Sequence, residues 1–118
     1  MGDIVETRAP HAGTPNDSTT SILLFDGDHR LVRNFEFHMA SGYAEVPWSI
    51  VLRVAMTTEC RCILIDQYAA DGRAAVDRAC ILRTRRLVRS FRLLGLRLCD
   101  HVVRSDDSCF SFRAAGLL

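Results

Sequence analysis

The sequence predicts an α/β (α+β) fold, in which helices pack on a mixed β-sheet and the elements follow the order β-β-α-β-α-β-β. Two alternating runs flank a turn at residues 27–29. Two stretches recur at helical spacing, over about 47–57 and about 74–94, with a short apolar run between them. A second alternating pair then closes the sequence around a Ser-Asp-Asp-Ser turn. This alternation of strands and helices argues against an all-helical or an all-β fold.

The first strand pair is formed by "SILLFD" and "RLVRNFEFHM", on either side of the turn Gly27-Asp28-His29. In the second run, two sets of side chains alternate: Leu31, Arg33, Phe35 and Phe37 against Val32, Asn34, Glu36 and His38. Side chains point to opposite faces of a strand in turn, so this run predicts a strand with two different faces.

Pro47 suits the first turn of a helix, and the apolar residues after it recur at helical spacing, which predicts a helix from about Pro47 to Thr57. The run "RCILID" that follows is short and apolar and has polar neighbours. It predicts a buried central strand that is covered on both faces.

The long helix is predicted from about Ala74 to Leu94. Its expected inner face recurs at steps of three and four residues and consists of Cys80, Thr84, Leu87, Phe91 and Leu94. We expect Gly95 to end the helix in a left-handed conformation, with Leu96 packed back on the last turn.

Length and composition indicate one domain, at 21–118, preceded by a flexible tail at 1–20 that contains little apolar material. No apolar run approaches the roughly 18 residues of a membrane span, and the polar N-terminus does not resemble a secretory signal, so we expect a cytoplasmic protein that does not enter a membrane. The five cysteines are then predicted to be reduced thiols. The net charge of +1 gives no global field that would attract nucleic acid.

The C-terminal part carries a resemblance. The segment "TRRLVRSFRLLGLRLCDHVV", a polar turn and "FSFRAAGLL" together resemble the end of the RadC-type JAB domain, a branch of the JAB/MPN metalloprotease-like superfamily. The likeness extends upstream through "CILID" to about Ser21. It implies the JAB/MPN (cytidine-deaminase-like) architecture, in which the final hairpin completes the sheet against the long helix.

Active members of that superfamily carry a His-x-His-Pro-Ser motif and a later Asp, which hold a zinc ion with an open position for water, while an upstream Glu acts as general base. Aligned on "ILRTRRL" without gaps, this chain has Gln67 and Ala69 at the two His positions and Cys80 at the Asp position. Aligned on the strand instead, Asp66 and Tyr68 take the His positions. Neither alignment restores the His pair, so the resemblance implies a degenerate member without zinc. Glu36 is the nearest candidate for the general base, although we expect a Glu on this alternating strand to face solvent.

Three functions remain open. The leading hypothesis is a catalytically inactive domain that serves as an interaction or scaffolding module for a protein partner or a second copy. The second is a metal-dependent hydrolase with an altered site, formed by Asp66, Asp71, Asp77 or Cys80. The third is a nucleic-acid-associated protein that uses an arginine face of the long helix, composed of Arg78, Arg85, Arg89 and Arg92. The DNA-repair association of RadC-type proteins comes with the family resemblance alone.

Two further pairs invite a chemical interpretation. Cys60 and Cys62 would lie on one face of a strand and could form a thiolate metal site with Cys80, but without further ligands they are predicted to be buried thiols. Asp100 and His101 are sequence neighbours on a strand, so they point to opposite faces and cannot pair as base and orienting carboxylate.

Overall fold

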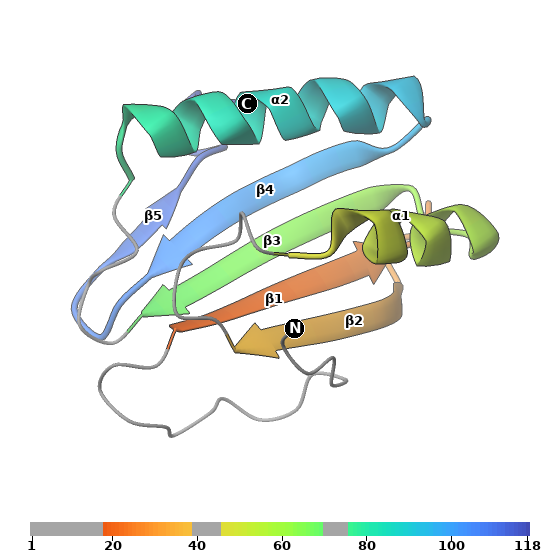
Figure 1. The fold of residues 1–118 in the computed structure, drawn as a ribbon, viewed down its shortest axis with the longest axis horizontal. Coiled ribbons are helices and arrows are strands. Elements are labelled where there is room, and N and C mark those ends of the chain that lie inside the picture. The colour runs from red at the N-terminus through yellow and green to blue at the C-terminus, as the bar shows by residue number, and fades with distance from the viewer. Residues whose placement is uncertain (1–17, 39–45, 70–75) are drawn as a thin grey trace.

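A computed structural model of the chain describes residues 18–38, 46–69 and 76–118, and shows a five-stranded sheet with two helices (Figure 1). The elements follow the predicted order: β1 Ser18–Phe25, β2 Leu31–His38, α1 Trp48–Thr57, β3 Cys62–Ala69, α2 Arg78–Leu93, β4 Arg97–Arg104 and β5 Cys109–Ser111. The sheet order is β2-β1-β3-β4-β5. The predicted fold class is confirmed.

The sheet is mixed because β3 and β4 run parallel, while β1–β2, β1–β3 and β4–β5 are antiparallel. Parallel neighbours need a long crossover, and α2 provides it. The β1–β2 turn is closed by the Asp26 carboxylate, which accepts hydrogen bonds from the backbone N–H groups of Asp28 and Arg30 at 2.8 and 3.0 Å. His29 adopts a φ of 63°, which completes the tight turn at the predicted place.

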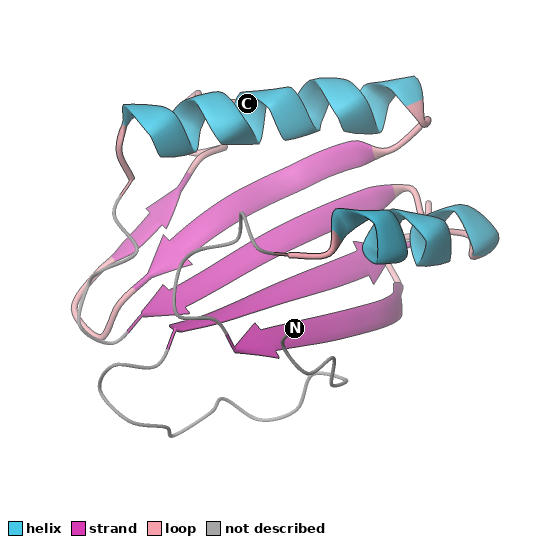
Figure 2. Cartoon of the chain, viewed as in Figure 1, coloured by secondary structure: helices cyan, strands magenta, loops and turns pink. Residues whose placement is uncertain are grey.

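Both helices contribute to one core on one face of the sheet (Figure 2). Trp48 of α1 meets Phe91 of α2 edge to face, with ring centroids 5.6 Å apart. The central position of β3 is confirmed, but coverage on both faces is not: Ile63, Ile65 and Gln67 are buried, whereas Leu64 and Asp66 between them are only half-buried. The strand also continues to Ala69, beyond the predicted end at Asp66.

The helix boundaries differ from the predicted ones mainly at the start of α2. It begins at Arg78 rather than near Ala74, because the Asp77 carboxylate caps it by accepting a hydrogen bond from the Cys80 N–H at 2.8 Å. At the other end Gly95 takes the predicted left-handed conformation with a φ of 75°, and Leu96 is buried against the last turn. Leu94, predicted on the inner face, is 39% exposed because it lies at the cap, where the helical periodicity has ended.

The N-terminal strand starts at Ser18, so three residues assigned to the flexible tail belong to the sheet. Residues 1–17 lie outside the described residues, and a tail there stays a prediction. Within the described ranges, neither helix combines the length and the apolar character that a membrane span requires.

The Asp100 carboxylate fixes the turn that follows the closing hairpin. Asp100 of β4 accepts hydrogen bonds from the Ser111 hydroxyl at 2.5 Å and from the Arg113 N–H at 2.9 Å. These bonds turn the chain directly after β5 and direct Phe112 into the core, where it is fully buried. The predicted architectural role of the hairpin therefore has a local cause, since the turn at Asp100 positions an aromatic ring under α2.

The cysteines contradict one prediction. Cys62 of β3 and Cys99 of β4 are joined in a disulfide, with Cα atoms 5.8 Å apart, within the range that disulfides require. The prediction of reduced thiols is wrong for this pair, because the sequence does not reveal that the two residues are neighbours across parallel strands. Cys60 and Cys80 are buried thiols outside any disulfide, as predicted, and Cys109 is an exposed thiol.

The core predicts a matched pair of stability effects on α2. Phe91 is fully buried, whereas Leu93, two residues later, is 88% exposed. We expect Phe91→Ala to lower the free energy of unfolding by about 3–5 kcal/mol, because the ring is lost and a cavity remains. Leu93→Ala should change it by less than about 0.5 kcal/mol. Urea unfolding followed by circular dichroism measures both, and equal losses would show that the helix does not pack as described.

Candidate functional site

Three buried polar side chains meet between the end of β3, the middle of α2 and β4. We call Gln67, Thr84 and His101 the polar cluster. Gln67 is 4% exposed, and the other two are fully buried. The His101 ring contacts both partners: Nδ1 lies 2.9 Å from the Thr84 hydroxyl and Nε2 lies 3.0 Å from Gln67 Oε1.

These contacts define one consistent arrangement of protons. With Oε1 of Gln67 as acceptor, Nε2–H of His101 is the donor, and Nδ1 then accepts the hydrogen bond that the Thr84 hydroxyl donates. This arrangement needs only a neutral imidazole. A protonated ring would direct a second N–H at the Thr84 hydroxyl and would place a charge in the core.

The surroundings of the ring favour the same state. The pKa of His101 is lowered from 6.5 to about 4, chiefly by burial; the negative charge of Asp100 opposes this shift, and the positive charge of Arg83 adds to it. Phe112 stacks on the imidazole with ring centroids 4.5 Å apart and planes inclined by 14°. The cluster is therefore a neutral unit sealed by an aromatic ring from the closing hairpin.

The polar cluster extends to a buried hydroxyl on β1. Thr20 pairs with Gln67 across the β1–β3 ladder and is fully buried. Within the part of the chain that the structure describes, its hydroxyl has no hydrogen-bond partner, which costs about 1–3 kcal/mol unless a small polar molecule satisfies it. A water molecule suits this neutral setting.

The predicted ligand positions fall on two different faces of the sheet. Gln67 and the fully buried Ala69 point to the helix side, where Cys80 of α2 is also buried. Asp66 and Tyr68 alternate with them and point to the opposite face. Only the first of the two sequence alignments thus places the strand positions on the same side of the sheet as the start of α2.

These residues do not fit the zinc ion that active members of the superfamily hold. The Gln67 amide is engaged by His101, Ala69 offers no donor atom, and Cys80 is the one remaining candidate ligand at these three positions. In the described ranges there is no group of three or more His, Cys, Asp or Glu side chains placed to hold a metal ion.

The alternative ligands on the opposite face have other partners. Both oxygens of Asp66 accept hydrogen bonds from Arg104, at 2.8 and 3.1 Å, and this contact raises the pKa of Arg104. The Tyr68 hydroxyl donates to Asp106, which raises the pKa of Tyr68. Arg104 also lies over the Tyr68 ring, 5.5 Å from its centroid. These contacts form an ordered surface cluster of charged and aromatic groups.

The remaining candidates for metal binding or acid–base chemistry are not brought together. Asp77 caps α2, Asp71 lies outside the described residues, and Cys62 is in the disulfide rather than beside Cys80.

Glu36 is expected from the sequence to face solvent, but its side chain is only 14% exposed and lies 3.4 Å from His38 Nε2. Both Glu36 and Asp66 pair with Ser21, so Glu36 points away from the polar cluster. A role for Glu36 as general base stays a prediction.

Asp100 and His101 do not form a catalytic pair, as predicted. The Asp100 carboxylate accepts a hydrogen bond from the His101 backbone N–H at 2.7 Å, while the His101 ring contacts Gln67 and Thr84. The polar cluster itself was not predicted, although Thr84 is a signal of it. A polar residue on the inner face of the long helix needs a buried partner.

The arginine face predicted on α2 is present as a surface. Its four members are exposed and lie on one side of the helix: Arg78, Arg85, Arg89 and Arg92. Among the described residues, none of them takes part in an ion pair. Their use in binding nucleic acid stays a prediction.

The lowered pKa of His101 predicts a pH dependence of stability. The unfolded chain binds a proton near pH 6.5, whereas the folded chain resists protonation to about pH 4. The contribution of neutral His101 to the free energy of unfolding is therefore complete above pH 6.5. The free energy of unfolding falls by about 3 kcal/mol as the pH drops to 4. Urea unfolding at several pH values measures the loss, and His101→Gln, which cannot titrate there, should lose less. The chain has four histidines, so the His101 NMR signal is identified as the one that His101→Gln removes. If that signal titrates near pH 6.5 in the folded protein, the neutral cluster is contradicted.

Comparison with known proteins assigns the chain to a family. The family model described as RadC-like JAB domain matches residues 3–117. Two curated relatives, each described as a UPF0758 protein, come from Xylella fastidiosa strains Temecula1 and 9a5c. Each is 31% identical over 106 residues, covering 88% of this chain. The chain spans 46% of the length of these relatives. It belongs to the RadC-like JAB domain family.

Proposed function

We propose that this domain is a non-catalytic member of the RadC-like family and acts as an interaction or scaffolding module for a protein partner or a second copy of itself. The observation that carries the proposal is the hydrogen bond between Gln67 and His101. The position expected to hold the first zinc ligand is occupied by an amide that supports the core.

The energetic cost of breaking the Gln67–His101 hydrogen bond supports this proposal. A zinc ligand must have a lone pair available for the metal. If Gln67 turned away from His101 to bind a metal, a buried imidazole nitrogen would be left without a partner. The residues at the ligand positions would then serve stability instead of catalysis. This fits a domain that keeps the family scaffold without its chemistry.

An interaction role is also supported by the outer surface of α2. Leu93 is 88% exposed and Leu82 is 44% exposed, three helical turns apart on the side that faces away from the sheet. Arg86 and Arg89 lie near them on the helix. Exposed leucines among arginines suit a partner that offers an apolar surface with acidic groups at its edge.

Metal analysis tests the non-catalytic assignment. We expect purified protein to contain substoichiometric zinc, and its thermal midpoint to be unchanged by a chelator, because no folding energy comes from a metal. Inductively coupled plasma mass spectrometry and a melting curve with and without EDTA measure these two quantities.

Zinc close to one per chain, together with a lower melting point in EDTA, would overturn the assignment. Two variants then identify the site. Loss of the metal in Cys80→Ser or Asp71→Asn would favour the hydrolase with an altered metal site. Retention in both would place the metal elsewhere.

A second candidate function, association with nucleic acid, is favoured by the composition of α2, which contains six arginines and no acidic residue. We expect the triple variant Arg78→Ala/Arg85→Ala/Arg89→Ala to weaken binding to a fluorescent oligonucleotide. The slope of log K against log salt should fall by about 0.9 for each duplex phosphate that the variant no longer binds.

The matched control is Arg30→Ala/Arg53→Ala/Arg61→Ala, which removes the same charge from exposed positions outside α2. Equal weakening in both triple variants would show a response to net charge alone and would exclude the helix face as the binding surface. Fluorescence anisotropy at several salt concentrations supplies both slopes.

A further inference from the structure

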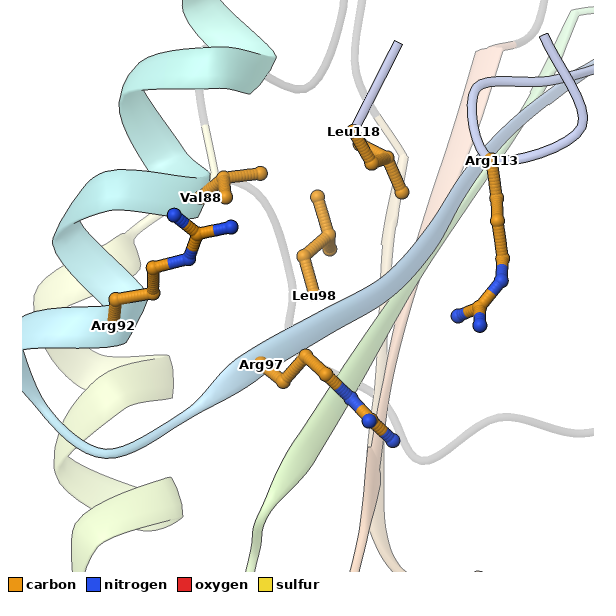
Figure 3. Close-up of a pocket in the computed structure, with 6 residues that line it drawn as sticks. All are labelled: Val88, Arg92, Arg97, Leu98, Arg113 and Leu118. Atoms are coloured by element: carbon orange, nitrogen blue, oxygen red, sulfur yellow. The ribbon is translucent and has the colours of Figure 1, made fainter. Parts of the chain in front are cut away.

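A pocket of about 290 Å³ opens between the C-terminal half of α2, the start of β4 and the turn after β5 (Figure 3). Three arginines and three apolar residues line it: Arg92, Arg97, Arg113, Val88, Leu98 and Leu118. It lies outside the polar cluster, and none of its lining residues belongs to the ligand positions that the family resemblance implies.

The charged side chains that line the pocket all have the same sign. Arg92 comes from the last turn of α2, Arg97 begins β4 and Arg113 follows β5, so three separate elements each contribute an arginine to the lining of the pocket. Figure 3 shows the guanidinium groups of Arg97 and Arg113 on one side of the pocket, while that of Arg92 lies on the helix side beside Val88.

These charges are not neutralised by pairing within the described ranges. Neither Arg92 nor Arg97 makes an ion pair or a side-chain hydrogen bond there. Arg113 is partly oriented, because its Nη1 donates to the Cys99 carbonyl at 3.2 Å and its backbone N–H donates to Asp100. The Asp100 carboxylate thus contacts the backbone of Arg113 and not its guanidinium group, and its other oxygen accepts a hydrogen bond from the Ser111 hydroxyl. Positive side chains that line one pocket favour the binding of an anion there.

The volume of the pocket and its apolar floor limit the size and the chemical type of the anion that can bind. Its volume equals that of about ten water molecules in the liquid, at the lower limit for small-molecule sites. Leu98 is 5% exposed and gives the floor an apolar character, together with Val88 and Leu118. A small charged group that carries a short apolar substituent fits both features.

We propose that this pocket binds a phosphate monoester, with the phosphate held by Arg92, Arg97 and Arg113 and the substituent placed on the apolar floor. A monoester carries close to two negative charges at pH 7, and its oxygens match the planar donors of arginine. Such a group occurs on free phosphorylated metabolites and at the 5′ end of a nucleic acid. The site is independent of the proposed non-catalytic role, because it shares no residue with the polar cluster.

Calorimetric titration with butyl phosphate tests the proposal. We expect saturable binding of one molecule per chain, weaker binding of inorganic phosphate, and none of butanol. Arg92→Ala and Arg97→Ala should each weaken binding tenfold or more, as expected for the removal of a charge-assisted hydrogen bond. Neither side chain is paired within the described ranges, so both variants should keep the wild-type melting point.

The matched control is Arg53→Ala on α1, which removes the same charge outside the pocket and should leave the affinity within twofold. Equal weakening in Arg53→Ala, or no saturable binding of butyl phosphate, would overturn the proposal. A short oligonucleotide with and without a 5′-phosphate separates the two sources. Tighter binding of the phosphorylated form, abolished in Arg97→Ala, would point to a nucleic-acid end, and no difference would point to a free metabolite.

Discussion

The buried, neutral imidazole of His101 is the interaction on which the relative positions of β3, α2 and β4 depend. Its two nitrogens are satisfied by Thr84 on the crossover helix and by Gln67 on the central strand. Burial of an unsatisfied polar group would cost more than most single contacts provide, so the three elements must keep their relative positions. The hydrogen bonds thereby fix α2 over the parallel pair β3–β4.

The closing hairpin completes this arrangement. Asp100 turns the chain after β5, and the turn places Phe112 on the imidazole, where it covers one face of the ring. The Asp100 carboxylate thus supports the cluster from the other side of β4, through the backbone N–H of His101 rather than through its imidazole. The neighbouring disulfide between Cys62 and Cys99 links the same two strands at their other end. The region expected to hold a metal in catalytic relatives is here stabilised by hydrogen bonds between neutral side chains, and the disulfide joins the opposite ends of the same two strands.

Charge in this chain is unevenly distributed, although the net charge is only +1. Asp66 is compensated by Arg104 on the face of the sheet opposite the polar cluster. The arginines of α2 extend to the pocket between Arg92, Arg97 and Arg113, where no such compensation exists among the described residues. A weak overall field combined with a concentrated basic surface suits local recognition of an anion rather than long-range attraction of a polyanion.

Local patterns in the sequence were sufficient to predict the order of elements, the β1–β2 turn and the Gly95 cap, because periodicity and turn chemistry act over a few residues. The family resemblance, aligned on "ILRTRRL", puts Gln67, Ala69 and Cys80 at the ligand positions, and this alignment stays a prediction. Only the tertiary structure decided what these side chains contact. The Gln67–His101 hydrogen bond spans 34 residues, the Cys62–Cys99 disulfide spans 37, and the three-arginine pocket joins three elements. Contacts over such separations depend on strand register and helix placement, which are properties of the whole fold and leave no local signature in the chain.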